Sequence, residues 1–129
     1  MTSDYPYDDR YDPPLRAVEV ALRHPDGDRA TWQSTGLLDT GADGTLVPSE
    51  VLWHISSPAV AEAQIRSHWG EPRVVQLFAA DLEIGGDWFP SVLVVGDDDG
   101  DDIVLGRNVL RKLKLVLDGV KGITQLSVR

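Results

Sequence analysis

The sequence contains no cysteine among its 129 residues. This absence excludes disulfide bonds, a thiolate nucleophile and every cysteine-based zinc site. Histidine is scarce too, and His24, His54 and His68 are too scattered for a recognisable metal motif. We interpret each histidine as a surface or partly buried residue. The sequence therefore predicts neither a bound metal nor a cofactor.

The sequence is also poor in positively charged residues. Lysine and arginine together number 12, against 21 acidic residues, which gives a formal net charge of −9. Nucleic-acid binding needs a basic face, so this composition argues against a nucleic-acid partner. A surface of this charge favours basic substrates instead.

Long apolar runs are missing as well. No segment approaches the roughly 20 apolar residues of a membrane-spanning helix, so we expect no membrane partner. The first nine residues are acidic and have no apolar core, so we expect no secretion signal and a cytoplasmic location. No Gly-x-Ser-x-Gly elbow, Walker loop or dinucleotide fingerprint occurs either.

What the chain does contain is a series of short apolar segments separated by turn signals. Its length suits one domain, which we divide into an acidic, flexible arm over 1–14 and a folded domain over 15–129. A short helix is predicted to start at Pro48, and the segment 56–66 is ambiguous. Strands are predicted at 15–22, 30–38, 45–47, 73–80, 82–84, 88–95, 113–117 and 123–128. Many short strands with little helix predict an all-β barrel or sandwich.

One segment points to chemistry. Leu37 and Leu38 look like the end of a buried strand, and they run directly into Asp39-Thr40-Gly41. A carboxylate placed there, on a turn that glycine makes possible, is held rigidly and partly out of water. Such carboxylates are often functional. The alternative is an Asx-type turn, in which the Asp39 side chain only bonds its own backbone.

A second segment has the same form. Ile103-Val104-Leu105 is an apolar strand that ends at Gly106, and a short helical pattern follows from Arg107. By itself, Gly106-Arg107-Asn108 also fits a helix N-terminus with Asn108 near the cap. The two interpretations are compatible.

Together these segments resemble the active-site loop and its late counterpart in retropepsin-like aspartic proteases, the single-domain, retroviral type. The pattern Asp-Thr-Gly-Ala-x-x-Thr-x-Val-Pro resembles bacterial members more closely than viral ones. The resemblance implies an all-β, closed acid-protease-type barrel with one short C-terminal helix. It also implies an ion pair between Asp43 and Arg107 that braces the loop.

Site roles follow from the resemblance, residue by residue. Asp39 would be catalytic, with Thr40 linking two loops through its hydroxyl and Gly41 exposing its carbonyl to substrate. Structural support would come from Ala42, Gly106 and Arg107. The turn around Gly70 would be the flap that closes over a peptide, although an ordinary hairpin is the alternative. Substrate contacts are assigned to Leu37, Asp43, Leu46, Gly70 and Val104. For Leu37, Leu46 and Val104, packing in the hydrophobic core is an equally good explanation.

The number of carboxylates limits the mechanism. Aspartic protease chemistry needs two carboxylates that share a proton, and the counterpart loop has no acid in the matching place. The chain would therefore act on a peptide or protein substrate as a two-fold homodimer, with one Asp39 per subunit. The competing hypothesis is a catalytically silent domain of the same fold that binds peptides or protein partners.

Two departures from the viral pattern matter for activity. Ala42 lacks the hydroxyl that acid-acting relatives place beside the catalytic carboxylate, so we expect an optimum at about pH 5–7 rather than 2–3. The acidic run from Asp97 to Asp102 replaces an apolar wall. It is either a solvated turn or a site where Asp101 and Asp102 attract basic side chains toward the cleft rim.

Overall fold

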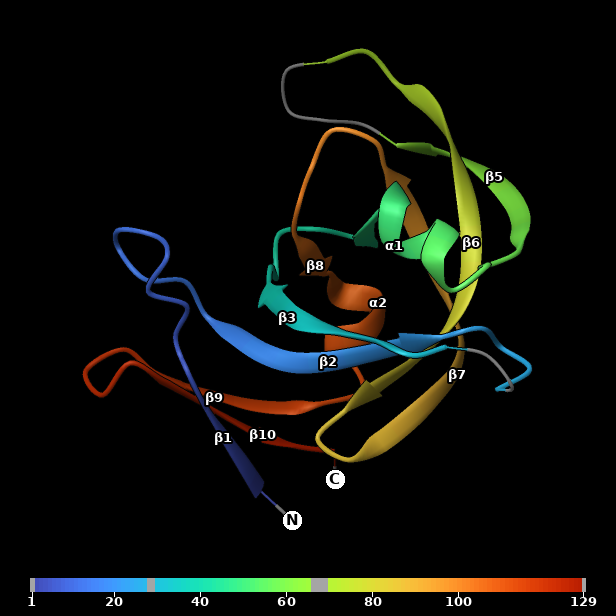
Figure 1. Ribbon diagram of the computed structural model, residues 1–129. Coiled ribbons are helices and arrows are strands. Elements are labelled where there is room, and N and C mark those ends of the chain that lie inside the picture. Colours follow the sequence, from blue (N-terminus) through green and yellow to red (C-terminus); the bar gives the residue numbers. More distant parts are fainter. Residues whose placement is uncertain (1, 28–29, 66–69, 129) are drawn as a thin grey trace.

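A closed β-barrel forms most of the molecule, as Figure 1 shows for the computed structural model, which describes residues 2–27, 30–65 and 70–128. The larger sheet has seven strands in the order β2-β3-β8-β4-β7-β6-β5. Pairing of β2 with β6, from Val20↔Ile84 to Arg23↔Asp81, closes the ring and leaves β5 outside it. Its strands are β2 (Ala17–Arg23), β3 (Trp32–Leu38), β4 (Thr45–Pro48), β5 (Ala59–Ile65), β6 (Arg73–Ile84), β7 (Asp87–Asp97) and β8 (Ile103–Leu105).

Alternation along the strands fills the barrel. In β2, Val18, Val20 and Leu22 are buried on one face, and on the other face small Ala17 and Ala21 are also buried while Glu19 is exposed. The ambiguous segment 56–66 contains β5, whose residues are mostly exposed because it pairs only with β6. The core contains the fully buried Leu22, Ile55, Leu82, Ile84, Ile103, Leu105 and Leu126.

Two short helices accompany the barrel within the described residues, close to the two places where the sequence predicted a helix. α2 (Arg107–Leu110) is the predicted C-terminal helix, and α1 (Ser49–His54) follows β4. Pro48 does not start α1 but precedes it in an extended conformation, with φ −53° and ψ 136°. The proline ring fixes φ without forcing ψ into the helical range, so Pro48 can end a strand instead.

A second sheet of three strands corrects the expectation for the N-terminus. β1 (Thr2–Pro6) pairs antiparallel with β10 (Ile123–Ser127), which also pairs with β9 (Lys114–Asp118). Residues 2–6 are therefore a paired strand, while the division of the chain at residue 14 stays a prediction. The prediction missed β1 because Asp4 and Pro6 are poor strand formers. Such residues are tolerated at a sheet edge, and β1 lies at an edge, where it pairs with β10 on one side.

Two kinds of feature are absent from the described residues. No helix there is long and apolar enough to cross a membrane. No group of three or more histidine, aspartate or glutamate side chains in the same ranges is arranged to hold a metal ion.

Candidate active site

The two sequence segments of interest meet in the sheet. β8 lies between β3 and β4, parallel to the first and antiparallel to the second. Val104 is the residue shared by both pairings, opposite Leu37 on β3 and Leu46 on β4. The loop from Asp39 to Gly44 therefore leaves the sheet on one side of β8 and returns on the other (Figure 1).

Asp39 is the first residue after β3. Its N–H donates to the carbonyl of Leu105 at 3.0 Å, which continues the β3–β8 pairing by one bond. Its Oδ1 accepts the N–H of Gly41 at 2.9 Å, so the Asx-type turn considered as the alternative does form. In the single chain Asp39, Thr40 and Gly41 are all exposed. The expectation that Asp39 is partly out of water is therefore wrong for this chain.

Gly106 permits the close contact between the two segments. A Cβ at this position would lie 2.1 Å from the carbonyl oxygen of Gly44 and 2.9 Å from that of Ala42. The constraint comes from neighbouring backbone and not from the conformation of Gly106 itself, whose φ is −94°. Only glycine lets the start of α2 pack this tightly against the candidate catalytic loop.

Arg107 ties the loop down by three contacts. Its backbone N–H donates to the carbonyl of Ala42 at 2.8 Å, and its Nη1 donates to the carbonyl of Thr40 at 2.9 Å. Its Nη2 forms the expected ion pair with Asp43. Both side chains are more than half exposed, so the ion pair itself adds little stability, and the bonds to backbone carbonyls do more to shape the loop.

Sequence reasoning missed Thr45 and the contacts of Asn108, two polar residues behind the loop. The Thr45 hydroxyl is buried, accepts the N–H of Gly106 at 3.1 Å and donates to Asn108 Oδ1 at 2.8 Å. Asn108 Nδ2 in turn donates to the carbonyl of Leu93 on β7 at 3.0 Å. Asn108 therefore does not cap α2, whose N-cap residue is Gly106 without a side-chain bond. The available signal was a threonine opening an otherwise apolar strand.

We expect Thr45→Val to destabilise the fold by about 1–3 kcal/mol, because it leaves the Gly106 N–H and the Asn108 amide without their buried partner. Valine keeps the shape of threonine, so packing changes little. Chemical denaturation measures the free energy of unfolding, and exposed Thr31→Val is the matched control. Equal stability of the two variants would contradict a structural role for the Thr45 hydroxyl.

The remaining predicted substrate residues differ in accessibility. Leu37 is buried, whereas Leu46 and Val104 are half-buried. Gly70 is exposed and lies in the connection of the β5–β6 hairpin, which rises above β8 in Figure 1. Residues 66–69 of the predicted flap turn lie outside the described residues. The hairpin is present, and its role as a flap stays a prediction.

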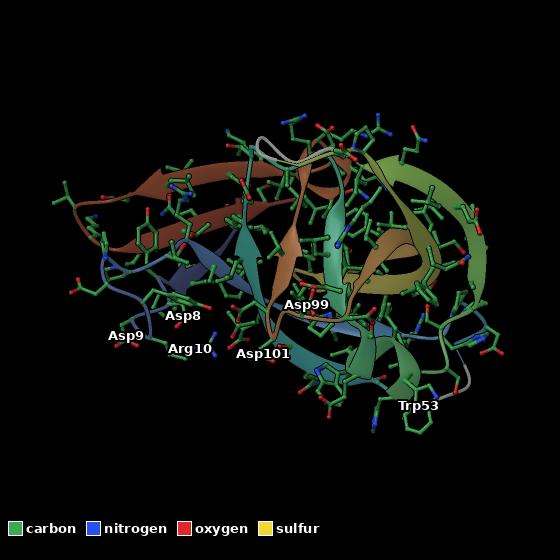
Figure 2. The ribbon with its side chains drawn as sticks, turned by 90° about the horizontal axis from the view of Figure 1, so that it is seen from above. Asp8, Asp9, Arg10, Trp53, Asp99 and Asp101 are labelled. Carbon is green, nitrogen blue, oxygen red and sulfur yellow. The ribbon has the colours of Figure 1, made fainter. Side chains whose placement is uncertain are left out.

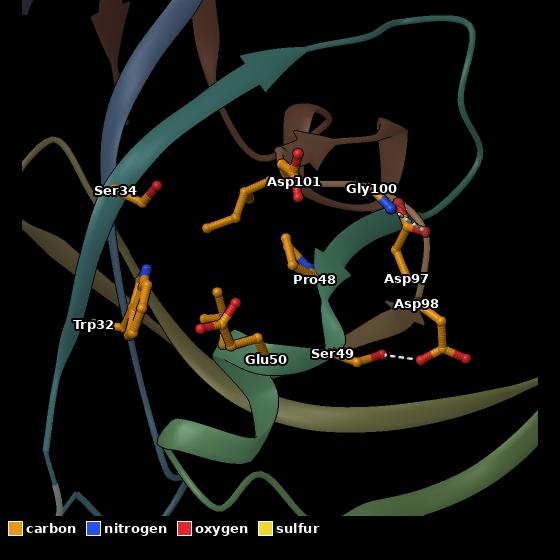
Figure 3. A pocket seen from close by; sticks show the side chains of 11 residues that line it. Trp32, Ser34, Pro48, Ser49, Glu50, Asp97, Asp98, Gly100 and Asp101 are labelled. Carbon is orange, nitrogen blue, oxygen red and sulfur yellow. Dashed lines mark hydrogen bonds between the residues drawn. The ribbon is translucent and has the colours of Figure 1, made fainter.

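The acidic run forms the loop between β7 and β8, at the opposite end of β8 from Asp39. Oδ1 of Asp97 accepts the N–H groups of Asp99 and Gly100, both at 3.0 Å, which closes a local turn. Asp98 accepts a hydrogen bond from Ser49 (Figure 3). Asp99 and Asp101 are exposed on the outside of this loop (Figure 2).

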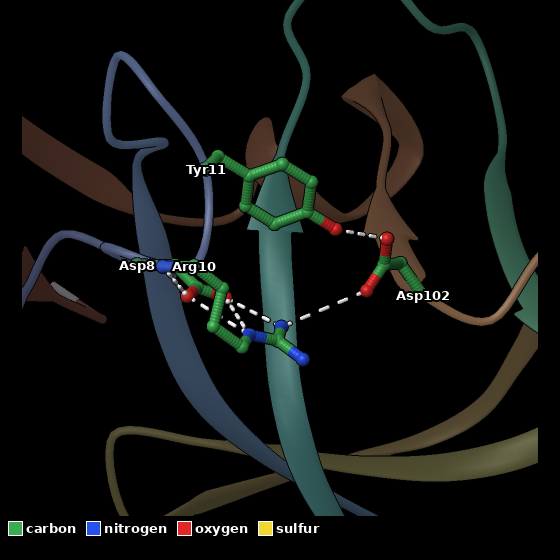
Figure 4. A network of polar contacts seen from close by, with 4 residues as sticks. All are labelled: Asp8, Arg10, Tyr11 and Asp102. Atoms are coloured by element: carbon green, nitrogen blue, oxygen red, sulfur yellow. Dashed lines mark hydrogen bonds and ion pairs between the residues drawn. The ribbon is translucent and has the colours of Figure 1, made fainter.

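Asp102 is engaged by the segment after β1 (Figure 4). It accepts a hydrogen bond from Tyr11 and lies 3.6 Å from the guanidinium of Arg10, which also binds Asp8 through Nε at 2.9 Å. The Arg10 guanidinium lowers the pKa of Asp8 below its ordinary value of 3.8, and the bond to Asp102 raises the pKa of Tyr11. Asp102 is therefore not free to attract a basic substrate side chain.

This network predicts an acid-sensitive contribution to stability. The folded-state pKa of Asp8 is depressed, so the contribution is present above the unfolded value of 3.8 and is lost as the pH falls through the folded value. We expect Asp8→Asn to lower the melting temperature modestly near neutral pH and to match the wild type in strong acid. Asp9→Asn is the adjacent control, and a pH-independent difference for Asp8→Asn would contradict the linkage.

Comparison with known proteins identifies the fold. No family model and no curated protein matches the sequence. Among solved structures, a retropepsin-like aspartic protease from Rickettsia conorii aligns with a TM-score of 0.64 at 16% identity, covering 98% of this chain and 91% of that one. A foamy viral protease-reverse transcriptase aligns with a TM-score of 0.57 at 18% identity, covering 78% of this chain and 12% of that one. The chain has the retropepsin-like fold, which confirms the resemblance seen in the sequence.

Proposed function

We propose that the chain is an aspartic-type endopeptidase that acts as a two-fold homodimer. The observation that carries this proposal is the placement of Asp39, exposed on a turn that Leu105, Gly41 and Arg107 hold in place. The fold it shares with the Rickettsia conorii protease supports the same function. Since one chain supplies one such carboxylate, the second would come from another copy.

Two Asp39 carboxylates brought together would share one proton, because close like charges cannot both ionise cheaply. The anionic carboxylate takes a proton from a water held between the pair, and the water oxygen attacks the scissile carbonyl carbon. The neutral carboxyl donates its proton to the developing oxyanion. Collapse of the tetrahedral intermediate then breaks the C–N bond, and the proton taken from water passes to the leaving amine.

Other residues would position the two loops and the substrate. In this proposal Thr40 links the subunits through its hydroxyl, and Gly41 offers its carbonyl to the peptide backbone. Leu37, Leu46 and Val104 line the subsites for apolar side chains, while exposed Asp43 contacts the substrate. The β5–β6 hairpin around Gly70 closes over the peptide and excludes water.

Cleavage of a mixed peptide library, measured from about pH 3 to 7, tests the proposal. We expect cleavage at concentrations where sizing shows a dimer, with a maximum at about pH 5–7 because Ala42 offers no hydroxyl to the carboxylate pair. A maximum near pH 3 would contradict the Ala42 argument alone. Absence of cleavage by a proven dimer would overturn the enzyme assignment in favour of peptide binding without catalysis.

A further inference from the structure

A second region of the surface has the features of a binding site, and it lies away from Asp39. Two adjoining pockets surround α1, one of about 330 Å³ and one of about 980 Å³. Trp32, at the start of β3, lines both, whereas Asp39 follows the end of that strand, roughly 20 Å away at the usual rise per residue. Both pockets are lined by Trp32, Ser49, Glu50 and Asp98.

The smaller pocket has an apolar wall. The indole of Trp32 and the ring of Pro48 face the pocket (Figure 3), and Val51 and Ile103 also line it. His54 contacts the indole edge to face, with ring centroids 4.8 Å apart and planes inclined by 72°. This contact helps to fix the orientation of the indole. An indole face of this kind packs well against an aliphatic stem and attracts a cation.

Carboxylates surround this wall. Asp97 and Asp98 are already engaged, the first in its own turn and the second by Ser49. Glu50, from α1, and Asp101, from the loop before β8, are exposed at the pocket and have no hydrogen bond or ion pair within the described residues. No lysine or arginine is among the described residues that line either pocket. The pocket therefore combines negative charge with an apolar side wall and lacks an internal counter-ion.

An independent feature marks the second pocket. Trp53, on α1, is 87% exposed at the outside of the molecule (Figure 2) and lines this pocket together with Leu52 and Phe78. A fully exposed tryptophan next to a hollow is typical of a surface that meets another macromolecule.

We propose that the surface around α1 binds a basic segment of a polypeptide. An arginine or lysine side chain enters the smaller pocket, lays its aliphatic stem on Trp32 and places its charged head between Glu50 and Asp101. A neighbouring apolar side chain of the same segment packs on Trp53. Charge complementarity with a chain of formal charge −9 selects a basic peptide and disfavours nucleic acid, whose phosphates this surface repels. The site does not depend on catalysis at Asp39.

Fluorescence anisotropy with a fluorescein-labelled peptide of alternating arginine and glycine tests the proposal. The measurement is made in the full chain carrying Asp39→Asn, which prevents cleavage and separates this result from the proposed function. We expect the double variant Glu50→Gln/Asp101→Asn to weaken binding about fivefold to tenfold. The control Glu19→Gln/Asp87→Asn removes the same charge from exposed positions elsewhere and is expected to change binding less than twofold.

Trp53→Ala provides a second test of the site. The substitution should not destabilise the fold, because the side chain is almost fully exposed. The second probe is a labelled peptide in which leucine replaces the glycines. We expect Trp53→Ala to weaken binding of this arginine–leucine peptide by a larger factor than binding of the arginine–glycine peptide. If the pocket double variant and the control double variant lost the same amount of binding affinity, general charge attraction would explain binding and the proposed site would be overturned. Equal binding of a citrulline–glycine peptide, or no binding of the arginine peptide at millimolar concentration, would overturn it as well.

Discussion

Peptide cleavage by Asp39→Asn is expected to fall at least about a thousandfold below that of the wild type. The substitution keeps the size of the side chain and leaves Oδ1 able to accept the Gly41 N–H, so the turn is preserved. In the proposed mechanism the substitution removes the anion that accepts a proton from water, and both carboxylates of the proposed dimer change together. Asp87→Asn, at an exposed hairpin position, is the control and is expected to retain full activity.

Mixing the two chains sharpens this test. In an equal mixture of wild type and Asp39→Asn that exchanges subunits freely, random pairing leaves about a quarter of the dimers with both carboxylates. Activity at constant total protein is therefore expected to fall to about a quarter of the wild-type value. Retention of half the activity would show that each subunit works alone, which would contradict the shared-dyad mechanism while leaving peptidase activity intact.

The largest expected effect on stability comes from Gly106→Ala. A Cβ at this position would lie 2.1 Å from the oxygen and 2.5 Å from the carbonyl carbon of Gly44, and neither is the end of a flexible side chain. Either α2 or the loop from Asp39 to Thr45 must move, so we expect a loss of about 3 kcal/mol in the free energy of unfolding. The Arg107 contacts to Thr40 and Ala42 would weaken with the same movement.

The matched control is Gly119→Ala, because nothing lies within 4 Å of a Cβ there. Its stability is expected to stay within about 0.5 kcal/mol of the wild type. Urea denaturation gives both values. If Gly106→Ala were as stable as Gly119→Ala, the close approach at Gly44 would not constrain the fold. If it were destabilised yet fully active when folded, the contact would matter for stability and not for the site.

Several elements of the fold could be predicted because their signals are local. The strand that ends at Leu38 and the turn that follows it depend on apolar residues and a glycine within five positions. The hairpin around Gly85 and Gly86 is similar, since both residues adopt positive φ that glycine accepts without strain. The ion pair of Asp43 with Arg107 could not be predicted from local signals, because the two residues are 64 positions apart. Only the family resemblance indicated that they lie beside each other.

Other features had no local signal. β1 is a strand only because β10, at the other end of the chain, supplies its partner groups. The exposure of Asp39 depends on where the barrel ends, and the Asp102 network depends on how the segment after β1 crosses the molecule. Asn108 lies near the start of α2, as expected, but its side chain does not cap the helix and instead bonds Thr45 and the carbonyl of Leu93.

The sequence by itself determined the candidate catalytic carboxylate, the glycines on which its loop depends and the fold that they predict. Turn chemistry and strand periodicity act over a few residues, so they can be read directly along the chain. The tertiary structure alone decided that β8 separates β3 from β4, that Thr45 bonds a residue 61 positions away and that Trp32 and Glu50 share a pocket. Such contacts depend on how the whole chain buries its apolar surface, and no short stretch of sequence contains that information.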